Sequence, residues 1–205
     1  MALTIDMRVC ELLASRLCHD LAGPIAAIDN GAELLDDDDP DFVRQAAKLI
    51  GDSAGSAARR LQFFRFVFGF SVGAIAGPPP HALVADYFVG GSVACTYREA
   101  ARQLDVAWQR LGCGLLMVAA EALPRGGSLT LAAEELDIVS VTALGEGAGP
   151  SAEITDALAL GAPVEALTSR SVGAYFAGLL AQSLGCRLRV AAKPGGFSIL
   201  CEVGG

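Results

Sequence analysis

Two long helical patterns separated by a short acidic turn limit the folds open to this chain more than any other feature of its sequence. Residues 4–35 and 41–68 repeat apolar side chains every three or four positions, which is the spacing of one helix face. The turn between them reads Asp36-Asp37-Asp38-Asp39-Pro40. Asp39 can cap the second helix and Pro40 suits its first position, and the acidic run is typical of a solvated turn. The pattern predicts an antiparallel helical hairpin.

Two helices alone bury little apolar surface, so the hairpin needs a partner. The second helix carries an apolar stripe whose alanines permit close approach of another helix. Its members are Val43, Ala47, Ile50, Ala54, Ala57, Leu61, Phe64 and Phe68. We therefore expect a second copy of the chain to complete a four-helix bundle, which would make the protein a homodimer.

One of the two histidines lies on the first predicted helix, beside a carboxylate, in the run Cys18-His19-Asp20-Leu21-Ala22-Gly23-Pro24-Ile25. Small or polar side chains about one turn from His19, and further along the same side, face away from the apolar side of the helix. These residues, which we call the docking face, are Ser15, Arg16, Ala22, Gly23, Ala26 and Asn30. A partner protein can approach the imidazole from this side without meeting bulky side chains.

This arrangement predicts that His19 accepts a phosphoryl group, because imidazole is a good nucleophile that is neutral near pH 7. Asp20 can orient the ring or hold the proton on Nδ1. Pro24 should bend the helix just below the site, because its ring removes a backbone hydrogen bond. For Arg16 two hypotheses stay open: contact with the phosphoryl group or a receiver carboxylate, or an ordinary solvated or paired arginine. A solvated histidine without a role is the alternative for His19.

The second half of the chain has a different pattern, and residues 71–80 read as a linker between domains 1–70 and 81–205. His81, after three prolines, is expected to be a linker or helix-start residue. Beyond it we predict helices over 83–88, 99–123, 152–160 and 169–184. We predict strands over 93–97, 128–134, 137–143, 187–192 and 197–203, with a turn at Glu135-Leu136 between the second and third strands. A glycine-rich loop is predicted over 145–149. This order predicts a mixed sheet covered by helices on one face, and an α+β fold for the whole chain.

Composition excludes several function classes. The formal net charge of -8 disfavours nucleic acid as a partner, since no basic patch offsets it. The six cysteines show no metal-ligand spacing, which predicts no intrinsic metal and suggests reduced thiols. No segment reads as a secretion signal or a membrane span, so we expect a cytoplasmic protein without membrane contact.

A histidine-bearing hairpin, a linker and an α/β sandwich, in this order, resemble the phosphotransfer and catalytic domains of sensor histidine kinases. Residues 19–25 are similar to the phosphoacceptor box of those kinases, and Pro124-Arg125-Gly126-Gly127 is similar to the turn after their asparagine-bearing helix. The resemblance implies that the C-terminal sandwich is related to a histidine-kinase ATPase domain.

The nucleotide-binding motifs of those kinases are degraded in this chain. Leu115 and Ala119 stand where the kinases carry asparagines, one of which binds magnesium. The loop Gly145-Glu146-Gly147-Ala148-Gly149 keeps the glycines and lacks the adenine-binding aspartate. Residues 168–173 lack the repeated glycines of the phosphate loop. The resemblance therefore implies no bound nucleotide or other intrinsic cofactor, and neither ATPase nor autokinase activity.

A kinase-like dimer that keeps its histidine without a nucleotide site resembles the ChpT family of alphaproteobacterial histidine phosphotransferases, and residues 172–181 are similar to the late helix of that family. The resemblance implies a phosphorelay. His19 would accept phosphoryl from the receiver aspartate of a hybrid histidine kinase and pass it to response-regulator receivers of the CtrA and CpdR type. Mg²⁺ would be held by the partner receiver, because His19 has no carboxylate cluster around it.

Three other functions remain open from the sequence. A histidine kinase with an atypical pocket would be labelled on His19 by ATP alone. A non-catalytic adaptor of two-component signalling would not need His19. A purely structural helical dimer would give His19 no special role.

Overall fold

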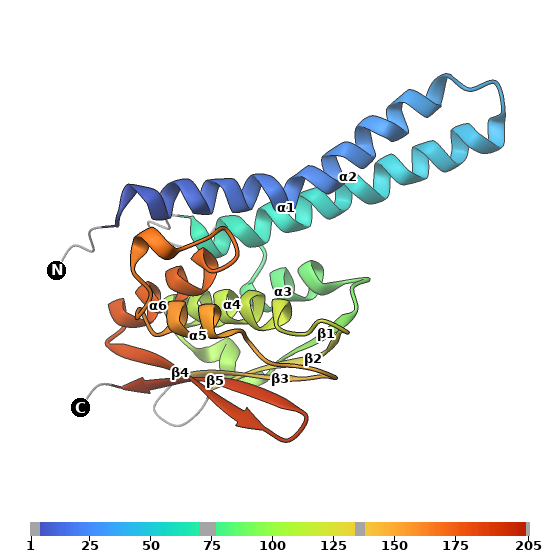
Figure 1. Cartoon of the computed structure of the whole chain (residues 1–205). Coiled ribbons are helices and arrows are strands. Elements are labelled where there is room, and N and C mark those ends of the chain that lie inside the picture. The colour runs from blue at the N-terminus through green and yellow to red at the C-terminus, as the bar shows by residue number, and fades with distance from the viewer. Residues whose placement is uncertain (1–4, 70–76, 134–137, 204–205) are drawn as a thin grey trace. The chain divides into compact units, whose positions relative to one another are not determined.

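The computed structural model describes residues 5–69, 77–133 and 138–203 (Figure 1). The predicted hairpin is confirmed: α1 (Met7–Glu33) and α2 (Pro40–Phe68) run antiparallel, joined by the short 3-10 helix η1 (Leu34–Asp36). The predicted start of the first helix at residue 4 lies outside the described residues. Asp39 caps α2 as expected, since its carboxylate accepts a hydrogen bond of 2.8 Å from the backbone N–H of Asp41.

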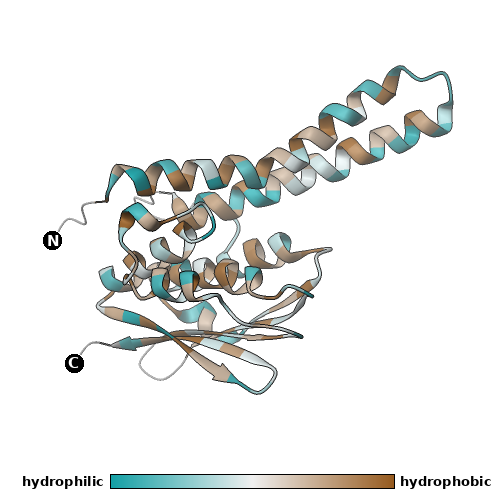
Figure 2. Cartoon of the chain, in the orientation of Figure 1, coloured by the Kyte–Doolittle hydropathy of each residue, from teal (hydrophilic) through white to brown (hydrophobic). Residues whose placement is uncertain are grey.

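The two hairpin helices approach closely at Gly31. A Cβ atom at that position would lie 2.7 Å from Cγ1 of Ile50 and 3.4 Å from the carbonyl oxygen of Ala46, so glycine is required for this contact. Figure 2 shows polar and apolar residues interspersed along both helices, as expected of helices with one apolar side. None of the helices in the described part combines the length and the apolar character that crossing a membrane requires.

The described chain divides into two compact units, and the division falls inside α1. Residues 14–69 form one unit; residues 5–13 belong with the C-terminal residues. Arg8 joins residues 5–13 to the C-terminal residues. Its Nε donates to the carbonyl oxygen of Val164 at 3.2 Å, and its Nη2 donates to the carbonyl oxygen of Leu167 at 3.3 Å. Val9 beside it is buried. Of the predicted linker 71–80, residues 71–76 lie outside the described part.

A five-stranded mixed sheet forms the C-terminal unit, in agreement with the prediction. Its strands are β1 (Val93–Tyr97), β2 (Gly127–Ala133), β3 (Val139–Leu144), β4 (Cys186–Lys193) and β5 (Gly196–Val203), and their order is β1-β2-β3-β5-β4. β1 pairs parallel with β2, whereas the remaining pairs are antiparallel. The predicted turn at Glu135-Leu136 lies outside the described residues.

Helices cover one face of this sheet (Figure 1). They are α4 (Val106–Glu121), α5 (Ala152–Leu158) and α6 (Val172–Ser183). The core between the layers is apolar, with Leu131, Val141 and Ile199 of the sheet fully buried. Gly112 brings α4 down onto the strands, because a Cβ there would lie 2.8 Å from Cδ1 of Leu131. The remaining helix, α3 (Pro80–Phe88), begins three residues before its predicted start, and His81 is its second residue, as a helix-start residue should be.

The helix predicted over 99–123 is wrong in its first turns. The chain forms a 3-10 helix, η2 (Glu99–Gln103), then an extended Leu104 and Asp105 before α4 begins. The buried amide of Gln109 stabilises this break, since its Nε2 donates to the carbonyl oxygen of Leu104 at 2.7 Å and to that of Arg102 at 3.3 Å. Its Oε1 accepts a hydrogen bond of 2.9 Å from the Tyr97 hydroxyl. Side-chain partners for these carbonyls replace the helical hydrogen bonds that the pattern predicts.

Candidate functional site

His19 projects from α1 with its side chain 86% exposed. The small or polar residues predicted around it are exposed as well, apart from Arg16, which is largely covered. The exposed members of the docking face are Ser15, Ala22, Gly23, Ala26 and Asn30. At Gly23 a Cβ atom would meet nothing within 4 Å outside its own helix and neighbours, which leaves this side open to a large partner.

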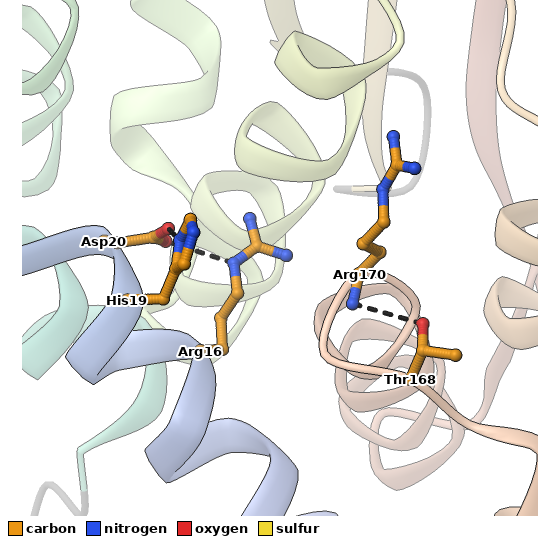
Figure 3. A network of polar contacts seen from close by, with 5 residues as sticks. All are labelled: Arg16, His19, Asp20, Thr168 and Arg170. Atoms are coloured by element: carbon orange, nitrogen blue, oxygen red, sulfur yellow. Dashed lines mark hydrogen bonds and ion pairs between the residues drawn. The ribbon is translucent and has the colours of Figure 1, made fainter.

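Arg16, His19 and Asp20 form a chain of polar contacts on α1 (Figure 3). Nε of Arg16 donates to Oδ2 of Asp20 at 3.1 Å, and Nδ1 of His19 lies 3.3 Å from Oδ1 of the same carboxylate. The Arg16 and Asp20 side chains are 13% and 18% exposed. An ionised carboxylate only accepts hydrogen bonds, so the contact favours the tautomer with the ring proton on Nδ1. Nε2, on the other side of the ring, then carries the free lone pair.

The backbone below His19 is adapted to a proline inside the helix. Pro24 has no N–H to offer the carbonyl oxygen of Asp20, one turn earlier, so the α-helical hydrogen bond at that point is missing. Gly23 precedes it and lacks the Cβ that a proline ring disfavours in a helical residue before it. Asp20 therefore contacts His19 through its side chain, while its backbone carbonyl lacks the α-helical hydrogen bond.

Two positions that the sequence resemblance assigns to the nucleotide site of sensor kinases are filled by apolar packing. Leu115 and Ala119 on α4 are both fully buried. In the loop 145–149, the N–H of Gly149 donates to the carbonyl oxygen of Ala122 at 3.0 Å, and the N–H of Gly145 donates to that of Gly195, also at 3.0 Å. These backbone donors are engaged within the chain.

The turn at residues 168–171, through which the chain enters α6, is capped by its own side chains (Figure 3). The Thr168 hydroxyl oxygen accepts hydrogen bonds from the N–H groups of Arg170 at 3.2 Å and Ser171 at 3.3 Å, and the Ser171 hydroxyl accepts from the N–H of Thr168 at 3.0 Å. The Thr168 hydroxyl donates in turn to Oε1 of Glu153 at 2.7 Å. Hydrogen bonds from Thr168 and Ser171 lower the pKa of Glu153. A carboxylate thus occupies the end of a helix where anions are favoured.

Sequence reasoning missed this cap, although part of it was visible. A threonine followed three residues later by a side chain that returns to its N–H is the capping-box pattern, and Thr168 and Ser171 have that spacing. Glu153 could not be found in the same way, because it lies fifteen residues earlier in the chain. Among the residues that the structure describes, no three His, Cys, Asp or Glu side chains are placed to hold a metal ion together.

Comparison with known proteins gives a consistent picture. The family model described as histidine phosphotransferase C-terminal domain matches residues 80–196. The protein phosphotransferase ChpT of Brucella abortus (strain 2308) is 32% identical over 185 residues, which cover 87% of this chain and 88% of that protein. A solved structure of a bacterial phosphotransferase superposes with a TM-score of 0.80 at 30% identity, covering 98% of both chains.

Proposed function

The chain belongs to the histidine phosphotransferase family, and on that premise we propose that it relays phosphoryl groups between receiver domains through His19. The observation that carries the proposal is the exposed imidazole whose Nδ1 contacts Asp20 and whose Nε2 faces away from that contact. The donor is the receiver domain of a hybrid histidine kinase. The acceptors are receivers of response regulators, of the CtrA and CpdR type. In this proposal the relay operates in the cytoplasm.

In the proposed reaction, the Nε2 lone pair attacks the phosphorus of the partner's aspartyl phosphate in line with the bond that breaks. The P–N bond forms as the P–O bond to the aspartate breaks, and its electron pair leaves with the carboxylate. The ring becomes a phosphoimidazolium that retains its Nδ1 proton, which the Asp20 carboxylate accepts as a hydrogen bond. In the reverse step a second receiver's carboxylate attacks phosphorus, and the P–N electron pair returns to Nε2.

We assign the Mg²⁺ of this transfer to the receiver. Phosphoryl transfer needs positive charge near the moving oxygens, and Mg²⁺ takes carboxylate and phosphate oxygens as ligands. Asp20 is the carboxylate in contact with His19, and each of its oxygens already has a partner, Arg16 or His19. The chain itself then contributes the nucleophile and its orientation.

The C-terminal sandwich, in this proposal, binds no ATP. Two fully buried apolar side chains, Leu115 and Ala119, fill positions that would have to present amides to a nucleotide. The Thr168 cap with the Glu153 carboxylate occupies the α6 N-terminus, where a phosphate would be repelled by the negative charge already there. The protein would then depend on receivers for its phosphoryl groups.

We further propose that two copies join through their hairpins into a four-helix bundle. Phe64 of the predicted stripe is buried within one chain, whereas Leu61 and the alanines at 47 and 54 are exposed. Leu61 on α2 and Ile25 on α1 are each 56% exposed. Cys18 lies seven residues before Ile25, on the same helix face, and is exposed too. An apolar surface of this kind is usually covered by a partner.

The dimer is tested by Leu61→Glu, which places a charge on the proposed interface. Light scattering should give the mass of a monomer for this variant and the mass of a dimer for the wild type. Gln62→Glu adds the same charge at the neighbouring exposed position and should remain dimeric. A wild-type monomer, or a dimeric Leu61→Glu variant, would contradict the proposed interface.

The relay is tested by mixing the protein with a phosphorylated receiver and Mg²⁺, in parallel with radiolabelled ATP alone, for wild type and His19→Ala. Acid-labile label that comes from the receiver, requires His19 and does not come from ATP supports the relay. Label from ATP alone would identify a kinase with an atypical pocket. No label from either source would favour a non-catalytic adaptor or a structural dimer.

A further inference from the structure

Arg16 contacts the carboxylate that contacts His19, and this connection assigns it a role in the reaction. We propose that Arg16 is a positioning residue that acts through Asp20, holding the carboxylate so that the proton stays on Nδ1 and Nε2 remains the nucleophile. The inference rests on the proposed function, in which Nε2 receives the phosphoryl group. The ion pair with Asp20 agrees with the sequence hypothesis of a paired arginine. The inference gives that pair a role in the reaction, in place of direct contact with the phosphoryl group or a receiver carboxylate.

The helix geometry favours this role. Arg16 and Asp20 are four residues apart, so their side chains lie next to each other on the helix surface. Nε of Arg16 approaches Oδ2 at 3.1 Å, whereas Nδ1 of His19 approaches the other oxygen, Oδ1. One carboxylate thus connects a cation on one side to the imidazole on the other.

The His19–Asp20 contact needs such support. At 3.3 Å it is longer than a typical N–H···O hydrogen bond, and the imidazole is 86% exposed, so water competes for both groups. Asp20 also follows His19 directly, and neighbouring residues do not face each other on a helix. A charge-assisted hydrogen bond from a guanidinium restrains the carboxylate rotamer that makes the contact possible.

Direct contact with the phosphoryl group fits the geometry less well. The two nitrogens of an imidazole ring point to opposite sides, and Nδ1 is the one that faces Asp20. A phosphoryl group on Nε2 would project away from the carboxylate that binds Nε of Arg16. After transfer, the guanidinium also holds the Asp20 carboxylate beside Nδ1, so Asp20 can accept a hydrogen bond from the phosphoimidazolium.

Transfer kinetics distinguish a residue that acts through Asp20 from one that acts on the phosphoryl group. Arg16→Met should slow transfer from a phosphorylated receiver about tenfold, the size of effect typical for a group that orients a ligating or reacting histidine. Arg16→Lys, which keeps a cation within reach of Oδ2, should recover most of the rate. Arg44→Met is the matched control, because Arg44 pairs with Asp41 elsewhere in the hairpin, and it should transfer at the wild-type rate.

The decisive comparison is made in an Asp20→Asn background. If Arg16 acts through the carboxylate, adding Arg16→Met to Asp20→Asn should change the rate by less than about twofold. If Arg16 contacts the phosphoryl group or the receiver, the rate reductions caused by Arg16→Met and Asp20→Asn should multiply in the double variant. Multiplying losses, or an Arg16→Met variant as fast as wild type, would overturn the inference.

A second readout does not depend on phosphoryl transfer. Nitrogen-15 NMR of the ring reports which nitrogen of neutral His19 carries the proton. The wild type should show the Nδ1–H form, and Arg16→Met should return the ring toward the Nε2–H form that free imidazole side chains favour. An unchanged tautomer in Arg16→Met would refute the positioning role. If the wild type accepts no phosphoryl group, the proposed function fails, while the tautomer still decides whether Arg16 acts on Asp20.

Discussion

A tryptophan in place of Ala22 should block phosphoryl transfer while leaving the protein folded. Ala22 lies three residues after His19, so its side chain is one turn from the imidazole, and it is exposed. On a helix the exchange of alanine for tryptophan costs about 0.5 kcal/mol in propensity, which is small against the stability of a domain. The indole buries about 150–250 Å² when covered, which is a substantial part of the roughly 800 Å² that one partner contributes to a standard interface.

The rate should fall by about 100-fold or more. In-line attack requires the receiver's phosphorus within about 3–3.5 Å of Nε2, and a misplacement of about 1 Å costs roughly 100-fold. An indole one turn away displaces an approaching domain by more than that. Ala22→Ser, which adds one small polar group, should transfer within about twofold of wild type.

The assay is the initial rate of label transfer from a phosphorylated receiver, with circular dichroism and light scattering to verify fold and oligomeric state. Ala107→Trp is the matched control, because Ala107 is an exposed alanine on α4. It should transfer at the wild-type rate. An Ala22→Trp variant that is folded and transfers within about threefold of wild type would refute the docking face.

Three further predictions concern stability and reactivity. Gln109→Leu should lower the free energy of unfolding, measured by denaturant titration, by about 3 kcal/mol, because it leaves the buried Leu104 carbonyl and the buried Tyr97 hydroxyl without their partner. The control is Gln45→Leu at an exposed position, which should change the free energy of unfolding by less than about 0.5 kcal/mol. Glu153 has a lowered pKa in the folded state, so its stabilising contribution is present above its unfolded pKa and is lost as pH falls through the lower folded value. Glu153→Gln should therefore make acid unfolding less steep, and an unchanged pH profile would contradict this. In the native protein the exposed Cys10 should react with a thiol reagent well before the buried Cys113 and Cys201, whose pKa values burial raises. Equal labelling of all three would be the contrary result.

Periodicity predicted most of the fold because it records which side of an element is buried. The alternating strands and the two amphipathic helices follow from local pattern, and the cap at Asp39 follows from local chemistry. The break at Leu104 and Asp105 could not be predicted in this way, since it depends on the buried amide of Gln109 and the hydroxyl of Tyr97. Tertiary hydrogen bonds outweighed a helical pattern at that point.

Local sequence patterns also predict only part of the candidate site. The position of His19 on an open helix face could be predicted from the small residues around it. The spacing of Arg16 and Asp20 also permits an ion pair, but a single helix face cannot decide between pairing and docking. The bonds from Arg8 to the carbonyls of Val164 and Leu167 join positions more than 150 residues apart, and no local pattern contains them.

The proposed relay requires that His19 both accepts and gives up a phosphoryl group. The most direct measurement loads the protein from one phosphorylated receiver, removes that receiver, and follows the label after a second receiver and Mg²⁺ are added. We expect acid-labile label on His19 that moves to the second receiver's aspartate, and none in a His19→Ala protein. Label that reaches the second receiver without His19, or that stays on His19 until it hydrolyses, would contradict the relay.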